Sequence, residues 1–229
     1  MMSSSTAVPV RSPNLARRAN AGPLALAAAG VLFVLYPAVR PYTDETSAPD
    51  AAVAFASPLW IVAHLAAVAG FVLVAFGLLA LRDRLVSTPG GRLALAALGV
   101  WWVGAGMVLP FYGAEIFALH EIGERIRRTG DVGVFDLVEA VRTGPVQFTV
   151  FGLGLLLLAV AAVLAALAVG RSGALGRWSG VAFAVGFGLY LPQFFAAPGL
   201  RIAHGVLVCV GCVIIAAELR RITPGETCL

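Results

Sequence analysis

Six apolar runs, each close to the length of a membrane-spanning helix, constrain this chain more than any other feature. They cover residues 21–39, 58–81, 93–119, 146–170, 178–200 and 201–219. A helix needs about 20 apolar residues to cross the hydrocarbon core. Because lipid offers no partner to backbone N–H and C=O groups, such runs must be helical. The sequence therefore predicts an all-α membrane protein, a bundle of six transmembrane helices.

The composition supports this class. Hydrophobic residues make up 60% of the 229 residues and charged residues only 12%, whereas about a quarter of the residues in soluble domains are charged. This balance excludes a disordered chain and almost any ordinary soluble enzyme. The three cysteines do not indicate a disulfide framework.

Arginine placement predicts the orientation of the bundle. With a cytoplasmic N-terminus, the segments on the cytoplasmic side hold ten arginines and the outer segments six, which is the bias expected of cytoplasmic loops. We therefore expect cytoplasmic tails over residues 1–20 and 220–229, and an N-in, C-in transmembrane domain over residues 21–219. All 16 basic residues are Arg, as is typical of a GC-rich genome, so the absence of Lys does not indicate a function. The expected location of the chain is a bacterial plasma membrane.

The arginines also bear on the partners of the protein. They are scattered between the apolar runs rather than clustered on one face, so they do not indicate binding to nucleic acid. The expected surroundings are the lipid bilayer. A small-molecule or ion ligand and a homo- or hetero-oligomer are both compatible with the sequence.

Two connections are long, and the predicted orientation places both outside. The first, residues 40–57, is rich in Pro, Asp, Ser and Thr and is expected to form a loop. The second, residues 120–144, contains a stretch that places Phe135, Val138 and Val141 near one helical face. This pattern predicts a short external interfacial helix between the third and fourth spans, lying as a cap over the bundle.

Small residues and two tryptophans inside the spans are expected to pack the bundle. Trp101 and Trp102 lie well inside the third span, where helix packing is favoured over ligand stacking. Small residues let membrane helices approach closely. Those expected to do so are Ala66, Gly70, Gly152, Gly154, Gly186 and Gly188.

Polar side chains within the predicted spans gather at one depth. His64 lies six residues after Pro58, roughly 9 Å below the outer end of its span. Glu115 is the one acidic residue well inside a span, on the outward half of the third. The second to sixth spans each bring polar residues to their outer third, while the inner halves are almost purely apolar. The residues of this layer are His64, Tyr112, Glu115, His120, Gln147, Tyr190, Gln193, Arg201 and His204.

The polar layer predicts an outward-facing pocket that binds or transports a small ligand or ion. An acid inside a span usually faces a partner or a cavity, so Glu115 is the strongest individual candidate. Its expected partner is Arg201 or one of the histidines.

Two alternatives remain open. In the first, His64, Glu115, His120 and His204 hold a transition metal, or two of the histidines hold a haem, in a membrane enzyme or redox protein. No two histidines have the spacing that places ligands on one helical face, and there is no H-E-x-x-H motif. In the second, the chain is a structural or accessory subunit of a membrane complex. No catalytic residue can be assigned from the sequence, so enzymatic activity is undecided.

Overall fold

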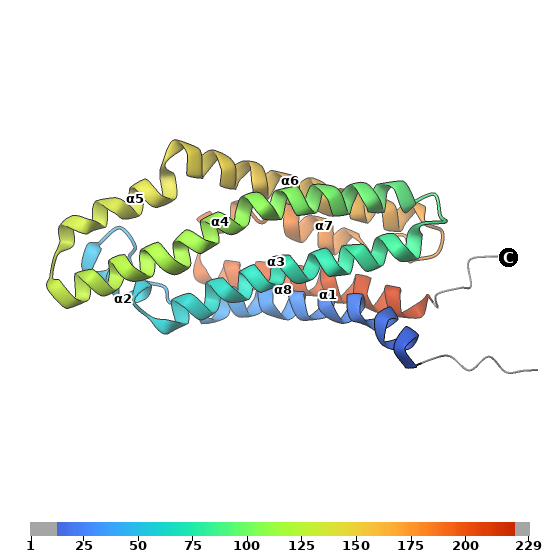
Figure 1. The fold of residues 1–229 in the computed structure, drawn as a ribbon, viewed down its shortest axis with the longest axis horizontal. Helices are drawn as coiled ribbons and strands as arrows, with labels where there is room; N and C mark the ends of the chain where they lie inside the picture. Colours follow the sequence, from blue (N-terminus) through green and yellow to red (C-terminus); the bar gives the residue numbers. More distant parts are fainter. Residues whose placement is uncertain (1–12, 223–229) are drawn as a thin grey trace, which may run out of the picture.

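The computed structural model describes residues 13–222, and this part of the chain folds into helices joined by turns (Figure 1). Among these residues, five helices are long and apolar enough to cross a membrane. They are α1 (Pro13–Val39), α3 (Pro58–Leu85), α4 (Gly91–Thr129), α6 (Pro145–Arg171) and α8 (Pro198–Arg221). The predicted all-helical class, with several apolar helices suited to a membrane, is confirmed.

The predicted tails fall mostly outside the described residues. The structure leaves out residues 1–12 and 223–229. Helix α1 begins at Pro13, earlier than predicted, although its apolar span covers Asn20–Val39. Since α8 continues to Arg221, the predicted boundary at residue 219 lies within two residues of its end.

The predicted fifth span differs from the prediction. Residues 178–200 contain an eight-residue helix, α7 (Val181–Gly188), then a turn and the 3-10 helix η2 (Pro192–Phe195). The α-helical ladder ends after Gly188 because Pro192, four residues on, has no N–H to donate to its carbonyl. The structure therefore contains five long helices and one interrupted segment, and a count of six spanning helices is not confirmed.

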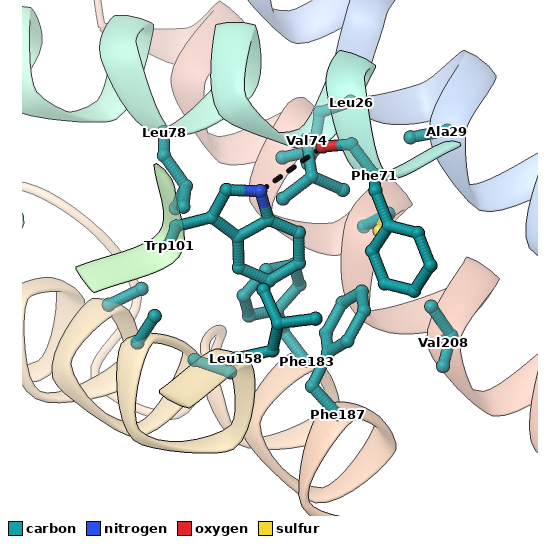
Figure 2. Close-up of a cluster of buried hydrophobic side chains, with 14 of the residues drawn as sticks. Leu26, Ala29, Phe71, Val74, Leu78, Trp101, Leu158, Phe183, Phe187 and Val208 are labelled. Atoms are coloured by element: carbon teal, nitrogen blue, oxygen red, sulfur yellow. Dashed lines mark hydrogen bonds between the residues drawn. The ribbon is translucent and has the colours of Figure 1, made fainter. Parts of the chain in front are cut away.

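Trp101 lies at the centre of the bundle core (Figure 2). Its indole Nε1 donates a hydrogen bond of 3.1 Å to the carbonyl of Phe71, and its ring meets Phe187 edge-to-face with centroids 4.8 Å apart. The predicted packing role of Trp101 is confirmed. The same prediction is wrong for Trp102, which is 62% exposed, because adjacent residues of a helix point to different sides.

Glycines bring several helices into close contact. A Cβ atom on Gly154 would lie 2.8 Å from Val108 Cγ2, and one on Gly186 would lie 3.0 Å from Val208 Cγ2. Both glycines therefore pack as predicted. The prediction is wrong for Gly152 and Gly188, since a Cβ at either position would meet no atom within 4 Å.

A cap covers one end of the bundle, which we call the capped end (Figure 1). The cap consists of α2 (Ala48–Phe55), η1 (Val132–Phe135) and α5 (Asp136–Thr143), packed against the last turns of α4. The predicted amphipathic helix is present as α5, with Val138 buried. The buried members of the cap cluster are Ala51, Ala52, Ala54, Phe55, Trp60, Leu119, Ile122, Ile126 and Val138.

Helix α2 lies in a segment that the sequence analysis expected to be a loop. Its start has helix-initiating features, because Ser47 precedes the helix and Pro49 occupies its first turn. Four of its eight residues are buried, including Phe55. These apolar side chains form a helix here because the outer part of α4 provides a surface for them.

Helix α4 is longer than the hydrocarbon core of a bilayer is thick. Helix α4 has 39 residues, a length of about 58 Å at 1.5 Å per residue. The hydrocarbon core is about 30 Å thick. Some turns of α4 therefore lie outside the hydrocarbon of a bilayer that the helix crosses.

Candidate functional site

A cavity of about 560 Å³ lies where the cap meets the bundle. Its walls come from the end of α1, from α3, α4, α5 and α6, and from the interrupted segment with the start of α8. The polar lining residues are Tyr36, Arg40, Glu45, His64, Tyr112, Glu115, Arg142, Thr143 and Arg201.

A chain of alternating charges runs along this cavity. Arg142 holds Glu115 with two parallel hydrogen bonds, Nε to Oε1 at 2.7 Å and Nη2 to Oε2 at 2.8 Å. Its Nη1 also donates to Oε2 of Glu45 at 2.8 Å, and Nη2 of Arg40 donates to the other Glu45 oxygen at 2.6 Å. This network joins α4 to α5 and to the segment after α1. Such charge-assisted, partly bidentate contacts are the strong class of hydrogen bond.

Glu45 and Arg142, two members of the network outside the spans, are held in their charged forms. Burial opposes the charge on Glu45, but Arg40 and Arg142 outweigh it and hold the pKa of the Glu45 carboxyl below its usual value. Burial also opposes the charge on Arg142, but Glu115 and Glu45 outweigh it and raise the pKa of that guanidinium. The Glu45–Arg142 contact is therefore an ion pair at neutral pH.

The charges around the cavity do not cancel. Three arginines, Arg40, Arg142 and Arg201, line it together with two carboxylates, those of Glu45 and Glu115. In addition, Nε of Arg40 is buried and has no hydrogen-bond partner among the described residues. The groups that line the cavity therefore carry an excess of positive charge.

His64 lines the cavity and contacts residues of α3 and α4. Its Nδ1 lies 2.7 Å from the carbonyl of Trp60, and because a carbonyl can only accept, Nδ1 carries the proton. Its Nε2 lies 3.7 Å from Oε2 of Glu115. The indole of Trp60 in turn donates to the backbone carbonyl of Glu115 at 2.7 Å, which ties α3 to α4. The expectation that Glu115 has a histidine neighbour agrees with this geometry, but its main partner is Arg142 rather than Arg201.

The other two histidines bond backbone carbonyls elsewhere. His120 Nδ1 lies 2.9 Å from the carbonyl of Phe55 in the cap, and His204 Nε2 lies 2.7 Å from that of Gly186. In the part of the chain that the structure describes, no group of three or more His, Cys, Asp or Glu side chains could hold a metal ion. Of the four ligands proposed from sequence, only His64 and Glu115 come together, so these residues do not fit a metal centre.

Arg201 has a structural role as well as a place in the cavity wall. Pro198 lacks the N–H that would pair with the carbonyl of Phe194 in a helix. Arg201 donates to this carbonyl from Nη2 at 2.5 Å and to that of Ala196 from Nε at 2.9 Å. The guanidinium thus pairs carbonyls that the interruption before α8 leaves outside a regular ladder.

His204 does the same at the end of α7. In a continuing α-helix the Tyr190 amide would donate to the carbonyl of Gly186, but here it donates to Phe187 at 3.2 Å. The Gly186 carbonyl accepts from His204 instead. Buried backbone groups need such partners, and in lipid the need is strongest.

The remaining predicted site residues are spread around the cavity. Tyr112 lines it, and its hydroxyl lies 3.2 Å from that of Tyr190. Gln193 is buried in η2, and Gln147 donates to the carbonyl of Ala140 at 3.3 Å. Of the nine residues predicted from sequence, the cavity lining includes His64, Tyr112, Glu115 and Arg201.

Five polar lining residues were missed by sequence reasoning: Tyr36, Arg40, Glu45, Arg142 and Thr143. Three of them are charged residues of the external segments, which appeared only to report orientation. For Arg142 a usable signal existed, because it follows Val138 by four residues and so shares the buried face of α5.

Comparison of this sequence with protein-family models, with curated proteins and with solved structures finds no match. The chemistry of the cavity therefore provides the basis for a function.

Proposed function

We propose that this chain is an integral protein of a bacterial plasma membrane and that the cavity under its cap binds a small molecule with an anionic group. In this proposal both chain ends are cytoplasmic and the cap faces outward. The arginine bias of the sequence supports that orientation.

The interrupted segment is proposed to be a sixth crossing. It connects the end of α6 at one end of the bundle to the start of α8 at the other (Figure 1). Its α7 packs closely on α8, since a Cβ on Gly211 would lie 2.4 Å from the Phe183 nitrogen. An even number of crossings is what two cytoplasmic ends require.

The excess positive charge of the cavity is the observation that carries the ligand proposal. An unbalanced charge in a poorly solvated site is costly, and a bound anion would remove much of that cost. Arg40 lines the cavity, is 9% exposed, and has one donor, Nε, without a hydrogen-bond partner in the described chain.

The proposal is tested by thermal unfolding of the protein in a maltoside detergent with three probes. These are inorganic phosphate, dodecyl phosphate and the zwitterion dodecylphosphocholine. We expect at least one of the two net anions to raise Tm, and the zwitterion not to. The Arg40→Gln variant should lose this ligand-induced shift, whereas Arg128→Gln, an exposed arginine at the same end, should keep it. No shift with either anion, or an equal shift in Arg40→Gln, would overturn the proposal.

A further inference from the structure

We infer that the ligand is an anionic amphiphile that enters from the bilayer. Its charged group would lie among the arginines of the cavity, and its tail would leave between α6 and the segment Leu191–Phe195. The inference rests on the proposed function and adds the class of ligand and its route.

Depth is the first argument. Arg40 lies 20 residues after Asn20 at the start of the α1 span, and Arg201 lies 20 residues before the end of α8 at Arg221. At 1.5 Å per residue, both are about 30 Å from the opposite end of the bundle. This equals the thickness of the hydrocarbon core, about 30 Å. The guanidinium groups therefore lie at the boundary where the phosphates of membrane lipids lie.

The position of the acidic group agrees with this depth. Glu115 lies 24 residues after Gly91, the start of α4, about 36 Å from the same end. Four helices thus place their cavity residues at one level, since His64 lies 21 residues before Leu85, about 32 Å from the end of α3.

The apolar wall of the cavity is the second argument. Phe148, Gly152 and Leu156 are spaced by four residues on α6 and share one face. Phe148 is 63% exposed and Leu156 is 59% exposed, although both line the cavity, and Phe195 across from them is 84% exposed. Side chains that line a cavity and are also exposed on an apolar helix mark an opening toward lipid. We call this opening the lateral mouth; its lining residues are Phe148, Gly152, Leu153, Leu156, Leu191 and Phe195.

The interrupted segment, which corresponds to the predicted fifth span, forms the other side of the lateral mouth. A short 3-10 helix, η2, stands beside α6 at this level instead of a continuous helix. Irregular backbone at membrane depth is tolerated where it is buried in protein or lines a cavity. Gly152 leaves the mouth open on the α6 side, because a Cβ there would meet no atom within 4 Å.

A soluble phosphate compound and a lipid headgroup share the chemistry that the arginines would recognise. The lipid is favoured because the lateral mouth is lined by apolar side chains that are exposed to the bilayer. A soluble anion would make no use of that apolar surface.

The test uses the full chain in nanodiscs of equal parts phosphatidylglycerol and phosphatidylcholine, with retained lipid counted by native mass spectrometry. We expect one phosphatidylglycerol per protein. Gly152→Trp should fill the lateral mouth and reduce retention at least tenfold. Gly106→Trp is the matched control, since Gly106 lies on α4 outside the cavity lining and also has no neighbour within 4 Å of a Cβ. This control should retain the lipid, and Arg40→Gln should lose it.

A second arm separates the two sources of the anion. Glycerol 1-phosphate is added to the protein in phosphatidylcholine nanodiscs, and binding is measured by the shift in Tm. If glycerol 1-phosphate binds and Gly152→Trp does not alter lipid retention, the inference fails while the proposed function stands. If neither the lipid nor glycerol 1-phosphate binds, both fail. Retention that Arg40→Gln leaves unchanged places the lipid elsewhere and also overturns the inference.

Discussion

Glu115 connects three helices, α3, α4 and α5. Its carboxylate holds Arg142 of α5, its backbone carbonyl accepts from Trp60 of α3, and its own helix is α4. The side chain is only 5% exposed, so its ion pair is poorly screened by solvent. Removing one partner of a buried ion pair leaves the other charge uncompensated, which costs more than the pair itself contributes.

Replacing Glu115 with Gln should therefore destabilise the protein. We expect a loss of about 2 kcal/mol in the free energy of unfolding, less than for a fully buried pair because Arg142 keeps Glu45 as a partner. Unfolding by SDS in mixed micelles measures it. Glu121→Gln, an exposed acid on the same helix, should change the free energy by under about 0.5 kcal/mol.

A double variant checks that the loss comes from the pair. With Arg142→Gln also present, the uncompensated charge is gone, so the double variant should be more stable than the sum of the two single effects predicts. Strict additivity would show that the two side chains do not interact in the folded protein.

Glu45 gives the protein an acid-sensitive component of stability. Its pKa is lower in the folded protein than its ordinary value of 4.5, so the unfolded chain binds the proton more readily. The stabilisation is complete above pH 4.5 and is lost as the pH falls through the lower, folded pKa. The Tm of Glu45→Gln should therefore fall less steeply than that of the unmodified protein between about pH 6 and about pH 3. Parallel curves for the two proteins would contradict this assignment.

At the scale of single residues, the sequence located part of the site. His64, Glu115 and Arg201 stand out because polar groups are rare in apolar helices, and all three line the cavity. Arg40 and Arg142 did not stand out, because charges in external segments are common and their burial depends on how the cap folds over the bundle. Tertiary packing, rather than local pattern, makes them part of the site.

The same distinction holds at the scale of elements. Helix α5 was predictable because its buried face shows in its own sequence. Helix α2 was not, since its buried alanines acquire a partner only when the last turns of α4 pack against them. Pro192 indicates an interruption of the fifth apolar run. The extent of the interruption was not predictable from composition, because hydropathy records which residues are apolar and not whether their backbone forms a continuous ladder.

His204 is expected to hold the end of α7 in place. His204→Phe keeps a flat ring of similar size but removes the donor to the Gly186 carbonyl, which should cost about 2 kcal/mol. Hydrogen exchange should rise in residues 186–197 and not in α3. Unchanged exchange in that segment would mean that the hydrogen bond does not support the interruption.

The cap is expected to unfold separately from the bundle when its own core is weakened. Phe55 is fully buried within the cap cluster, so Phe55→Ala should cost about 3 kcal/mol. Limited proteolysis should then cut between residues 129 and 145 while the five long helices stay protected. Leu137→Ala, which changes a residue that is 53% exposed, should not increase cleavage. Cleavage within the long helices of Phe55→Ala would show that the cap and the bundle unfold together.

For the whole molecule, the proposed orientation predicts which connections reach each side of the membrane. In a variant without native cysteines, Val132→Cys in the cap should react with a membrane-impermeant maleimide in intact cells. Ser87→Cys, between α3 and α4 at the opposite end, should react only after permeabilisation. Both positions are exposed, so access depends on the side of the membrane. The reverse labelling pattern would contradict an outward-facing cap.

The order of synthesis gives the charge network a consequence for assembly in the membrane. Glu115 emerges 27 residues before Arg142, its bidentate partner, so α4 enters the bilayer while this carboxylate still lacks its guanidinium. Glu45 is also made earlier; it pairs with both Arg40 and Arg142, and only Arg142 comes after α4. Helix α5 therefore supplies Arg142, the last residue of the charge network to be synthesised. A chain that ends just after α4 therefore lacks the bidentate partner of Glu115.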